Sequence, residues 1–151
     1  MAMAADAEGI GRCLESAFEP FRSQYTPGAF DDTVPGTKAI RERMARMRVY
    51  VAVTSDGGIV GTVASALEAE ECHLRGMAVH PEWQGHGIAE RLLRTVVSEL
   101  LAVGYKRIML DTTEPLQRAI SFYRRNGFVP SGRVTDFFGM PLYEYVKTLS
   151  D

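Results

Sequence analysis

Residues 79–89 read VHPEWQGHGIA, and this stretch decides the fold that we expect. It leaves an apolar run typical of a strand and enters a run of helical periodicity, with Gly85 and Gly87 between them. Glycine has no Cβ, so it permits tight turns and lets a ligand approach the main chain. The N–H groups from Gly85 to Ala89 stand at a helix start, where the helix leaves donors unpaired and the dipole is positive. The stretch therefore favours an anion site, for which a diphosphate is the natural guest.

Other glycine-containing loops differ from this one at residues that can be checked. A nucleotide P-loop has Lys and then Ser or Thr after its glycines, whereas Gly87 is followed by Ile88. A dinucleotide fingerprint needs a third glycine early in a repeated βαβ unit, but Ala89 occupies that place and the loop lies mid-chain. A plain glycine-rich turn before a helix stays open on these residues alone.

The region after the loop predicts a helix, a strand and a second helix. Apolar residues recur there at helical steps, namely Ile88, Leu92, Leu93, Val96, Val97, Leu100 and Leu101. Gly104 predicts the helix end, residues 107–110 a buried strand, and residues 116–125 another helix that Asn126 and Gly127 close. The unit from 72 to 110 predicts a right-handed crossover between parallel strands that are neighbours or nearly so.

The rest of the chain predicts two more helices and the remaining strands. Helical periodicity covers 10–21 and 37–47, and the Pro-Gly pairs at 27–28 and 35–36 predict loops. The remaining predicted strands are 50–54, 59–66, 72–79, 128–134 and 142–148, the first two forming a hairpin. With no linker or repeat, we expect a single domain over 1–151, of α/β (α+β) class, with a mixed sheet and helices on its faces.

Composition excludes some classes of function. The chain has 151 residues, 46% hydrophobic and 24% charged, and a formal net charge of −2, which gives no reason to expect nucleic acid or an anionic membrane as partner. Cys13 and Cys72 match no metal-ligand spacing, and residues 1–7 lack the pattern of a signal peptide. We therefore expect a soluble, cytoplasmic protein that holds no metal.

Two segments resemble the GNAT N-acetyltransferases. Residues 84–89, QGHGIA, are similar to that family's pyrophosphate loop, Gln/Arg-x-x-Gly-x-Gly/Ala, and residues 74–82, LRGMAVHPE, to its fourth strand. Residues 119–128, AISFYRRNGF, resemble a second family signature of helix, Gly-Phe turn and strand. The blocks lie in the family's order over about 48–148. The resemblance implies a mostly antiparallel sheet of six to seven strands with helices on both faces.

The resemblance also implies a coenzyme site. Acetyl-CoA would be the co-substrate, with its pantetheine arm along the strand backbone and its pyrophosphate in the loop. Tyr123, four residues before Gly127, would protonate the leaving thiolate, although a core tyrosine fits the same spacing. Tyr143 and Tyr145 are weaker candidates. The coenzyme residues implied are Met77, Ala78, Val79, Gln84, Gly85, His86, Gly87, Ile88 and Ala89.

The base that deprotonates the amine is less constrained. His73 stands six residues before Val79, where some relatives carry a glutamate, and imidazole can accept a proton near neutral pH. Glu71 and Glu114 are alternatives, and so is water. His86 suits a phosphate neighbour better than catalysis.

Two positions depart from the family pattern. Leu116 replaces an asparagine that contacts the pantetheine arm in relatives, so Thr113 or Gln117 would have to substitute. The first helical pattern begins almost at once, so the family's first strand is missing or short. That end of the chain helps to shape the acceptor pocket.

The leading hypothesis is acetyl transfer from acetyl-CoA to a primary amine by direct attack, with a small-molecule acceptor favoured. A coenzyme A-binding sensor without turnover, and an acetyltransferase acting on protein lysines or N-termini, are the alternatives. A homodimer through the last strands is a further option. The acceptor itself has no signature in 21–47 or 136–142.

Overall fold

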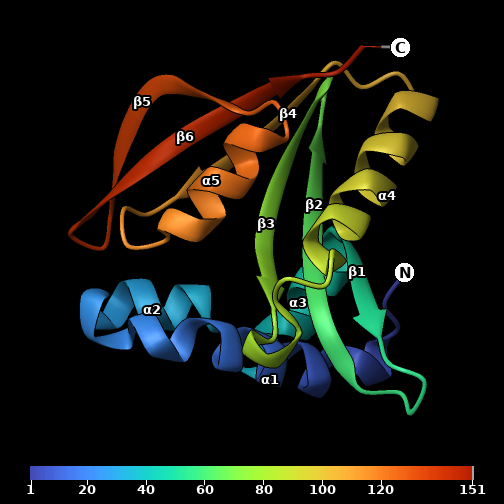
Figure 1. Ribbon diagram of the computed structural model, residues 1–151, viewed down its shortest axis with the longest axis vertical. Coiled ribbons are helices and arrows are strands. Elements are labelled where there is room, and N and C mark those ends of the chain that lie inside the picture. Colours follow the sequence, from blue (N-terminus) through green and yellow to red (C-terminus); the bar gives the residue numbers. More distant parts are fainter. Residues whose placement is uncertain (151) are drawn as a thin grey trace.

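A computed structural model describes residues 1–150 and shows six strands in one sheet with helices against it (Figure 1). The elements in chain order are η1 (Ala4–Asp6), α1 (Ala7–Phe18), η2 (Glu19–Gln24), α2 (Pro27–Thr33), α3 (Thr37–Arg46), β1 (Arg48–Val53), β2 (Ile59–Glu68), β3 (Glu71–Val79), η3 (Pro81–Trp83), α4 (Ile88–Ala102), β4 (Arg107–Thr112), α5 (Gln117–Arg125), β5 (Val129–Phe137) and β6 (Met140–Thr148).

The strands lie in the order β1-β2-β3-β4-β6-β5. β3 and β4 are parallel neighbours, as the strand–helix–strand unit predicts, and every other pair is antiparallel. The mixed, mostly antiparallel sheet confirms the predicted fold class. Within residues 1–150 the first regular element is η1, so no strand precedes α1.

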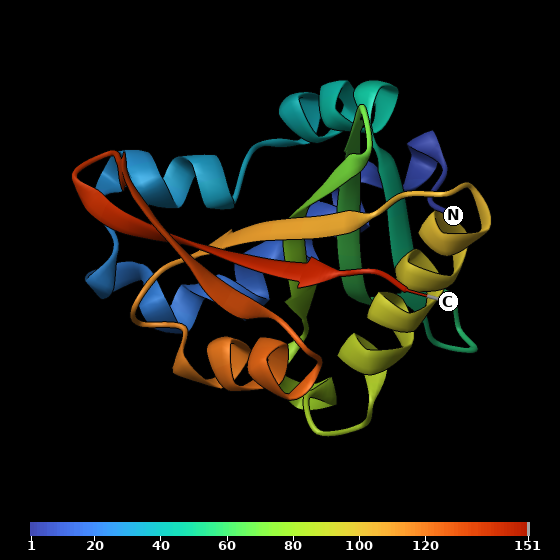
Figure 2. The same cartoon turned by 90° about the horizontal axis from the view of Figure 1, so that it is seen from above.

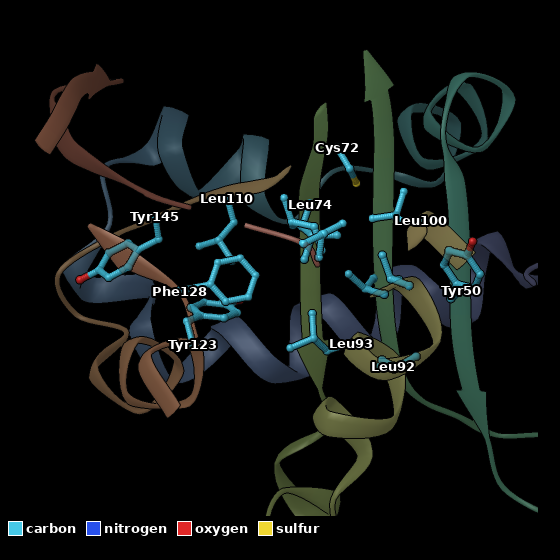
Figure 3. Close-up of a cluster of buried hydrophobic side chains, with 14 of the residues drawn as sticks. Tyr50, Cys72, Leu74, Leu92, Leu93, Leu100, Leu110, Tyr123, Phe128 and Tyr145 are labelled. Carbon is cyan, nitrogen blue, oxygen red and sulfur yellow. The ribbon is translucent and has the colours of Figure 1, made fainter. Parts of the chain in front are cut away.

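Two buried clusters occupy the two faces of the sheet. One packs α4 and α5 against the strands around Val63, Leu74 and Phe128 (Figure 3). The other packs α1, α2 and α3 against the opposite face around Ala64 and Ala78. Alternate residues of β2 thus serve different clusters, as the two-residue period of a strand requires. Helices therefore cover both faces, which confirms the prediction.

The segment from 27 to 33 corrects the sequence prediction. A loop was expected after Pro27, but α2 begins there. Proline suits the first helical position, where its missing N–H would be unpaired anyway, and the Thr26 hydroxyl accepts a hydrogen bond from the Ala29 N–H at 3.2 Å. The first helix is also shorter than its periodicity suggested: α1 ends at Phe18, and Phe21 lies in the 3₁₀ helix η2.

α2 contacts the β5–β6 hairpin, although the two are more than 100 residues apart in sequence. The Thr26 hydroxyl donates to the Phe138 carbonyl at 2.8 Å, and the views in Figures 1 and 2 agree on this proximity. Segments 21–47 and 136–142, which had no readable signature, therefore lie together. Within residues 1–150, no helix is both long enough and apolar enough to cross a bilayer.

Candidate active site

The loop before α4 has the backbone of an anion cradle. Gly85 and Gly87 have φ of +85° and +77°, in the left-handed region that favours glycine. The N–H groups of Gly85 to Ala89 donate to no acceptor within residues 1–150. α4 has 15 residues, so its dipole adds partial positive charge at this point.

Gln84 fixes the loop in place. Its amide nitrogen donates to the Val79 carbonyl at 3.1 Å, and its amide oxygen accepts from Arg118 Nη1 at 3.2 Å. The side chain thereby joins the end of β3, the loop and α5, which lie together at the lower edge of Figure 2. Gln84 acts by positioning the cradle.

β3 loses one of its two neighbours, β4, as it approaches the loop. Its pairing with β4 ends at Leu74↔Leu110, and the two strands then separate. On its other side β3 bulges, because Gly76 and Met77 together oppose the single residue Val63. The stretch from Gly76 to Val79 therefore has an open edge on the β4 side, where a ligand can pair with the main chain.

A groove of about 510 Å³ joins the loop to this open edge. α1, η2 and α5 complete its walls with Phe18, Phe21 and Phe122, and Arg118 and Arg125 stand on its rim. All the predicted coenzyme residues except His86 line it. The His86 side chain is exposed, and its ring lies 5.7 Å from the Trp83 ring.

Tyr123 is buried at the inner end of this groove. Its ring lies 5.6 Å from that of Phe122 and 5.7 Å from that of Phe128, and the residue is 8% exposed (Figure 3). Burial raises the pKa of Tyr123 to about 12, so its hydroxyl stays protonated at neutral pH. Within residues 1–150 this hydroxyl makes no hydrogen bond, and it is therefore available to a ligand.

A second cavity of about 420 Å³ adjoins the groove. Phe18, Met77, Leu116 and Tyr123 line both, so the hollows meet beside the β3 bulge. His73 lies in the second cavity, and its Nε2 is 2.9 Å from Asp111 Oδ2. The histidine and a carboxylate thus face the hollow that the tyrosine closes.

The other sequence candidates lie away from the junction. Glu71 pairs with Arg107 at 3.1 Å and, like Glu114, lines neither hollow. Thr113 binds the Tyr25 hydroxyl at 2.6 Å, and the Gln117 amide donates to the Glu114 carbonyl. Neither therefore substitutes in the groove for the asparagine of relatives.

Further candidates on the β strands are also accounted for. Tyr145 packs in the buried cluster beside Arg124, and neither it nor Tyr143 lines a hollow. Cys72 is fully buried, and burial raises the pKa of its thiol to about 11, so it is a poor nucleophile at neutral pH.

Sequence reasoning missed several polar residues of the two hollows. Arg118 and Arg125 stand two turns apart on one face of α5, a spacing that could have indicated a basic rim. Asp111 directly follows the buried strand predicted over 107–110. Only the register between β3 and β4 brings its carboxylate next to His73. Arg43 and Asp32 come from the segment without a signature.

Known proteins share this fold and part of this sequence. A stretch of 76 residues is 34% identical to the uncharacterized N-acetyltransferase YjgM of Escherichia coli K12, covering 50% of this chain and 44% of that protein. The match thus spans less than half the length of that curated relative. The model of the acetyltransferase (GNAT) family matches residues 11–128.

Solved structures superpose over nearly the whole chain. The PaiA N-acetyltransferase of Thermoplasma acidophilum, in complex with coenzyme A, has a TM-score of 0.80 at 16% identity and covers 97% of this chain and 95% of its own. Ard1 of Thermoplasma volcanium has a TM-score of 0.81 at 15% identity, with coverages of 99% and 95%. At these identities the likeness shows the fold, and the family match carries the assignment: the chain belongs to the GNAT family of acetyltransferases.

Proposed function

We propose that this chain transfers the acetyl group of acetyl-CoA to a small primary amine by direct attack. One observation carries the proposal: an anion cradle, an open strand edge and a buried tyrosine line a single groove, which joins a second cavity at the tyrosine. A donor and an acceptor would thus meet at one point, which removes much of the entropic barrier to reaction.

The loop fits a diphosphate. The N–H groups from Gly85 to Ala89 have no acceptor within residues 1–150, and an added Cβ on Gly87 would meet no atom within 4 Å, so the cradle is open. Arg118 and Arg125 on the rim supply positive charge that the net charge of −2 conceals. A neighbour of the same fold was solved with coenzyme A, which supports the same ligand here.

The open edge of β3 suits the pantetheine arm and the thioester. Bound acetyl-CoA would supply an activated acetyl carbonyl. As the amine attacks, negative charge builds on the carbonyl oxygen, and a fixed N–H near Met77 to Val79 lowers the barrier without reorganisation.

In this proposal Tyr123 protonates the leaving sulfur. Burial keeps its hydroxyl neutral, and the residue lines both hollows. Proton transfer from a positioned side chain contributes roughly 100-fold or more to such reactions.

His73 is our candidate for the base, with Asp111 as a positioning residue. Asp111 Oδ2 lies 2.9 Å from His73 Nε2 and would orient the ring, so that Nδ1 takes a proton from the amine directly or through water. Neither cysteine is suited to carry the acetyl group as an intermediate, because burial raises the pKa of Cys13 and of Cys72 to about 11.

The experiment is a release assay for coenzyme A with acetyl-CoA and a panel of small amines, lysine peptides and free-N-terminal peptides. Turnover of small amines with sequential kinetics supports the proposal. Tight binding of acetyl-CoA without transfer to any amine would identify a sensor, and transfer confined to peptides would identify a protein-modifying enzyme.

A further inference from the structure

The second cavity has a polar lining with charges of both signs. Two arginines, Arg43 and Arg75, line it together with Asp32, Glu68, His73 and Asp111. The volume of about 420 Å³ falls in the range of small-molecule sites, roughly 300–1,000 Å³. A ligand that fills it must therefore satisfy charged groups as well as contribute an amine.

Arg43 is the unusual member of this lining. It lies in the last turn of α3 and is half-buried, and within residues 1–150 it forms no ion pair or side-chain hydrogen bond. Burial, and then the nearby Arg75, lower the pKa of Arg43, while Asp32 raises it. Even partial burial of a cation without a close partner is unfavourable, so proteins normally pair such groups.

The main chain is shaped around this guanidinium. A Cβ on residue 76 would lie 2.8 Å from Arg43 Nη1, and Gly76 has φ of +58°. The glycine thus lets the cation reach the bulge, one residue from Met77. Arg43 therefore stands beside the point where the two hollows meet.

The neighbouring ion pair between Arg75 and Asp32 does not neutralise the charge of Arg43. Arg75 Nη2 lies 3.7 Å from Asp32 Oδ2, longer than a charge-assisted hydrogen bond of about 2.7–2.9 Å. Arg43 and Arg75 both lie near the Asp32 carboxylate, so this group of three side chains carries one positive charge in excess. A planar, forked guanidinium matches a carboxylate best, because it can donate two parallel hydrogen bonds.

We infer that the acceptor is a small amine that also carries a carboxylate, and that Arg43, assisted by Arg75, binds that carboxylate. This inference rests on the proposed function, because it assigns the acceptor of the same site. The amine then points to the junction at Tyr123, and the carboxylate stays next to Gly76. Arg43 thereby selects the substrate without entering the chemistry.

Matched pairs of amines test the inference. The pairs are L-methionine with 3-(methylthio)propylamine, L-phenylalanine with phenethylamine, and γ-aminobutyrate with propylamine. We expect kcat/KM to be at least tenfold higher for the carboxylate member of one or more pairs. Equal or better use of every amine that lacks the carboxylate would overturn the inference.

Variants on α3 identify the residue responsible. In Arg43→Met the ratio of kcat/KM between the carboxylate amine and its matched amine should fall towards one. Arg43→Lys should restore part of that ratio. The matched control is Arg46→Met, an exposed arginine of the same helix that lines neither hollow and should keep the wild-type preference. A preference that survives in Arg43→Met would contradict the assignment.

Calorimetry separates this inference from the proposed function. Each carboxylate amine is titrated into wild type and Arg43→Met in the presence of coenzyme A. Binding that weakens at least tenfold in the variant supports the inference even if no amine is acetylated, a result that would contradict only the proposed function. If no carboxylate amine binds, the inference fails, whatever other amines are acetylated.

Discussion

The two hollows that meet at Tyr123 differ in how the chain builds them. The groove is made largely from a strand, a loop and a helix that follow one another along the chain, and its ligand-facing groups are mostly main-chain N–H groups. The second cavity takes its polar groups from α2, α3, β3 and β4, and these groups are side chains. A site made of main-chain groups depends little on which side chains are present, whereas a site made of side chains changes with each substitution.

The difference also predicts which substitutions matter in each hollow. In the groove the sensitive positions are those where the backbone needs a conformation that only glycine adopts readily. In the cavity the sensitive positions are charges. Variants can therefore separate the two by their effects on coenzyme affinity and on acceptor use.

Gly87→Val should have the largest effect. Its φ of +77° is strained for a β-branched residue, and relaxation of that strain would turn the N–H groups of the cradle away from the phosphates. We expect coenzyme A affinity to fall roughly 100-fold or more, given about 1–3 kcal/mol of strain plus the lost contacts. Calorimetry with coenzyme A measures the change.

Gly57→Val is the matched control. Gly57 also has a left-handed φ, of +90°, with no atom within 4 Å of an added Cβ, but it lies in the β1–β2 turn away from the groove. Gly57→Val should lower the free energy of unfolding about as much as Gly87→Val does, and it should keep the wild-type affinity for coenzyme A. Equal loss of affinity in both variants would mean that strain alone, and not the cradle, explains the result.

Tyr123→Phe tests the junction of the two hollows. The variant keeps the ring contacts with Phe122 and Phe128 and removes the proton donor, so kcat should fall about 100-fold while coenzyme A affinity stays within twofold. Steady-state kinetics and calorimetry measure the two values. Tyr145→Phe, which alters a buried tyrosine outside both hollows, should turn over normally. Wild-type turnover in Tyr123→Phe would make this tyrosine a core residue only.

The sequence predicted the groove well because its signals are local. Gly85, Gly87 and the apolar stripe that starts at Ile88 lie within a few residues of one another, and local pattern determines both the turn and the helix start. Tyr123 was likewise identified from a local segment, the resemblance of residues 119–128 to a family signature with a tyrosine four residues before Gly127. These residues needed no knowledge of how distant strands pair.

The second cavity was not predictable in the same way. Asp111 meets His73 only because β3 and β4 are parallel with a particular register, and a one-residue slip would turn Asp111 to the other face. Arg43 reaches Gly76 only because α3 packs across the sheet. The predicted loop at Pro27 was wrong because proline also suits the first position of a helix, where it does not interrupt the hydrogen bonds.

His73→Asn tests the acceptor side and should have a smaller effect. Water can take over part of the proton transfer, so we expect kcat/KM to fall about tenfold, less than the roughly 100-fold or more that a positioned acid or base contributes. In Asp111→Asn kcat/KM should fall less, because Asp111 acts through His73. Glu71→Gln is the control, since it breaks a different ion pair between β3 and β4 and lies outside both hollows. A wild-type value of kcat/KM in His73→Asn would assign the proton transfer to water.

The smallest effect should come from the two buried thiols, through the pH dependence of stability. The thiols lie on opposite sides of the sheet. Cys72 lies in the cluster under α4 and α5, and Cys13 lies on α1, and burial raises the pKa of each thiol from 9.0 to about 11. The folded state therefore retains protons that the unfolded chain releases. This contribution to stability is complete below about pH 9 and disappears as the pH rises through about 11.

Urea unfolding at intervals from pH 8 to pH 10.5 measures this contribution. The free energy of unfolding should decline with pH in the wild type and decline less steeply in Cys13→Ala and in Cys72→Ala. In the native protein at pH 8 both thiols should resist iodoacetamide, and unfolding should expose both. Rapid alkylation of Cys72 alone in the native protein would show that the cluster under α4 and α5 opens. That cluster would then be the more mobile half of the core, contrary to the burial that raises the pKa of the Cys72 thiol.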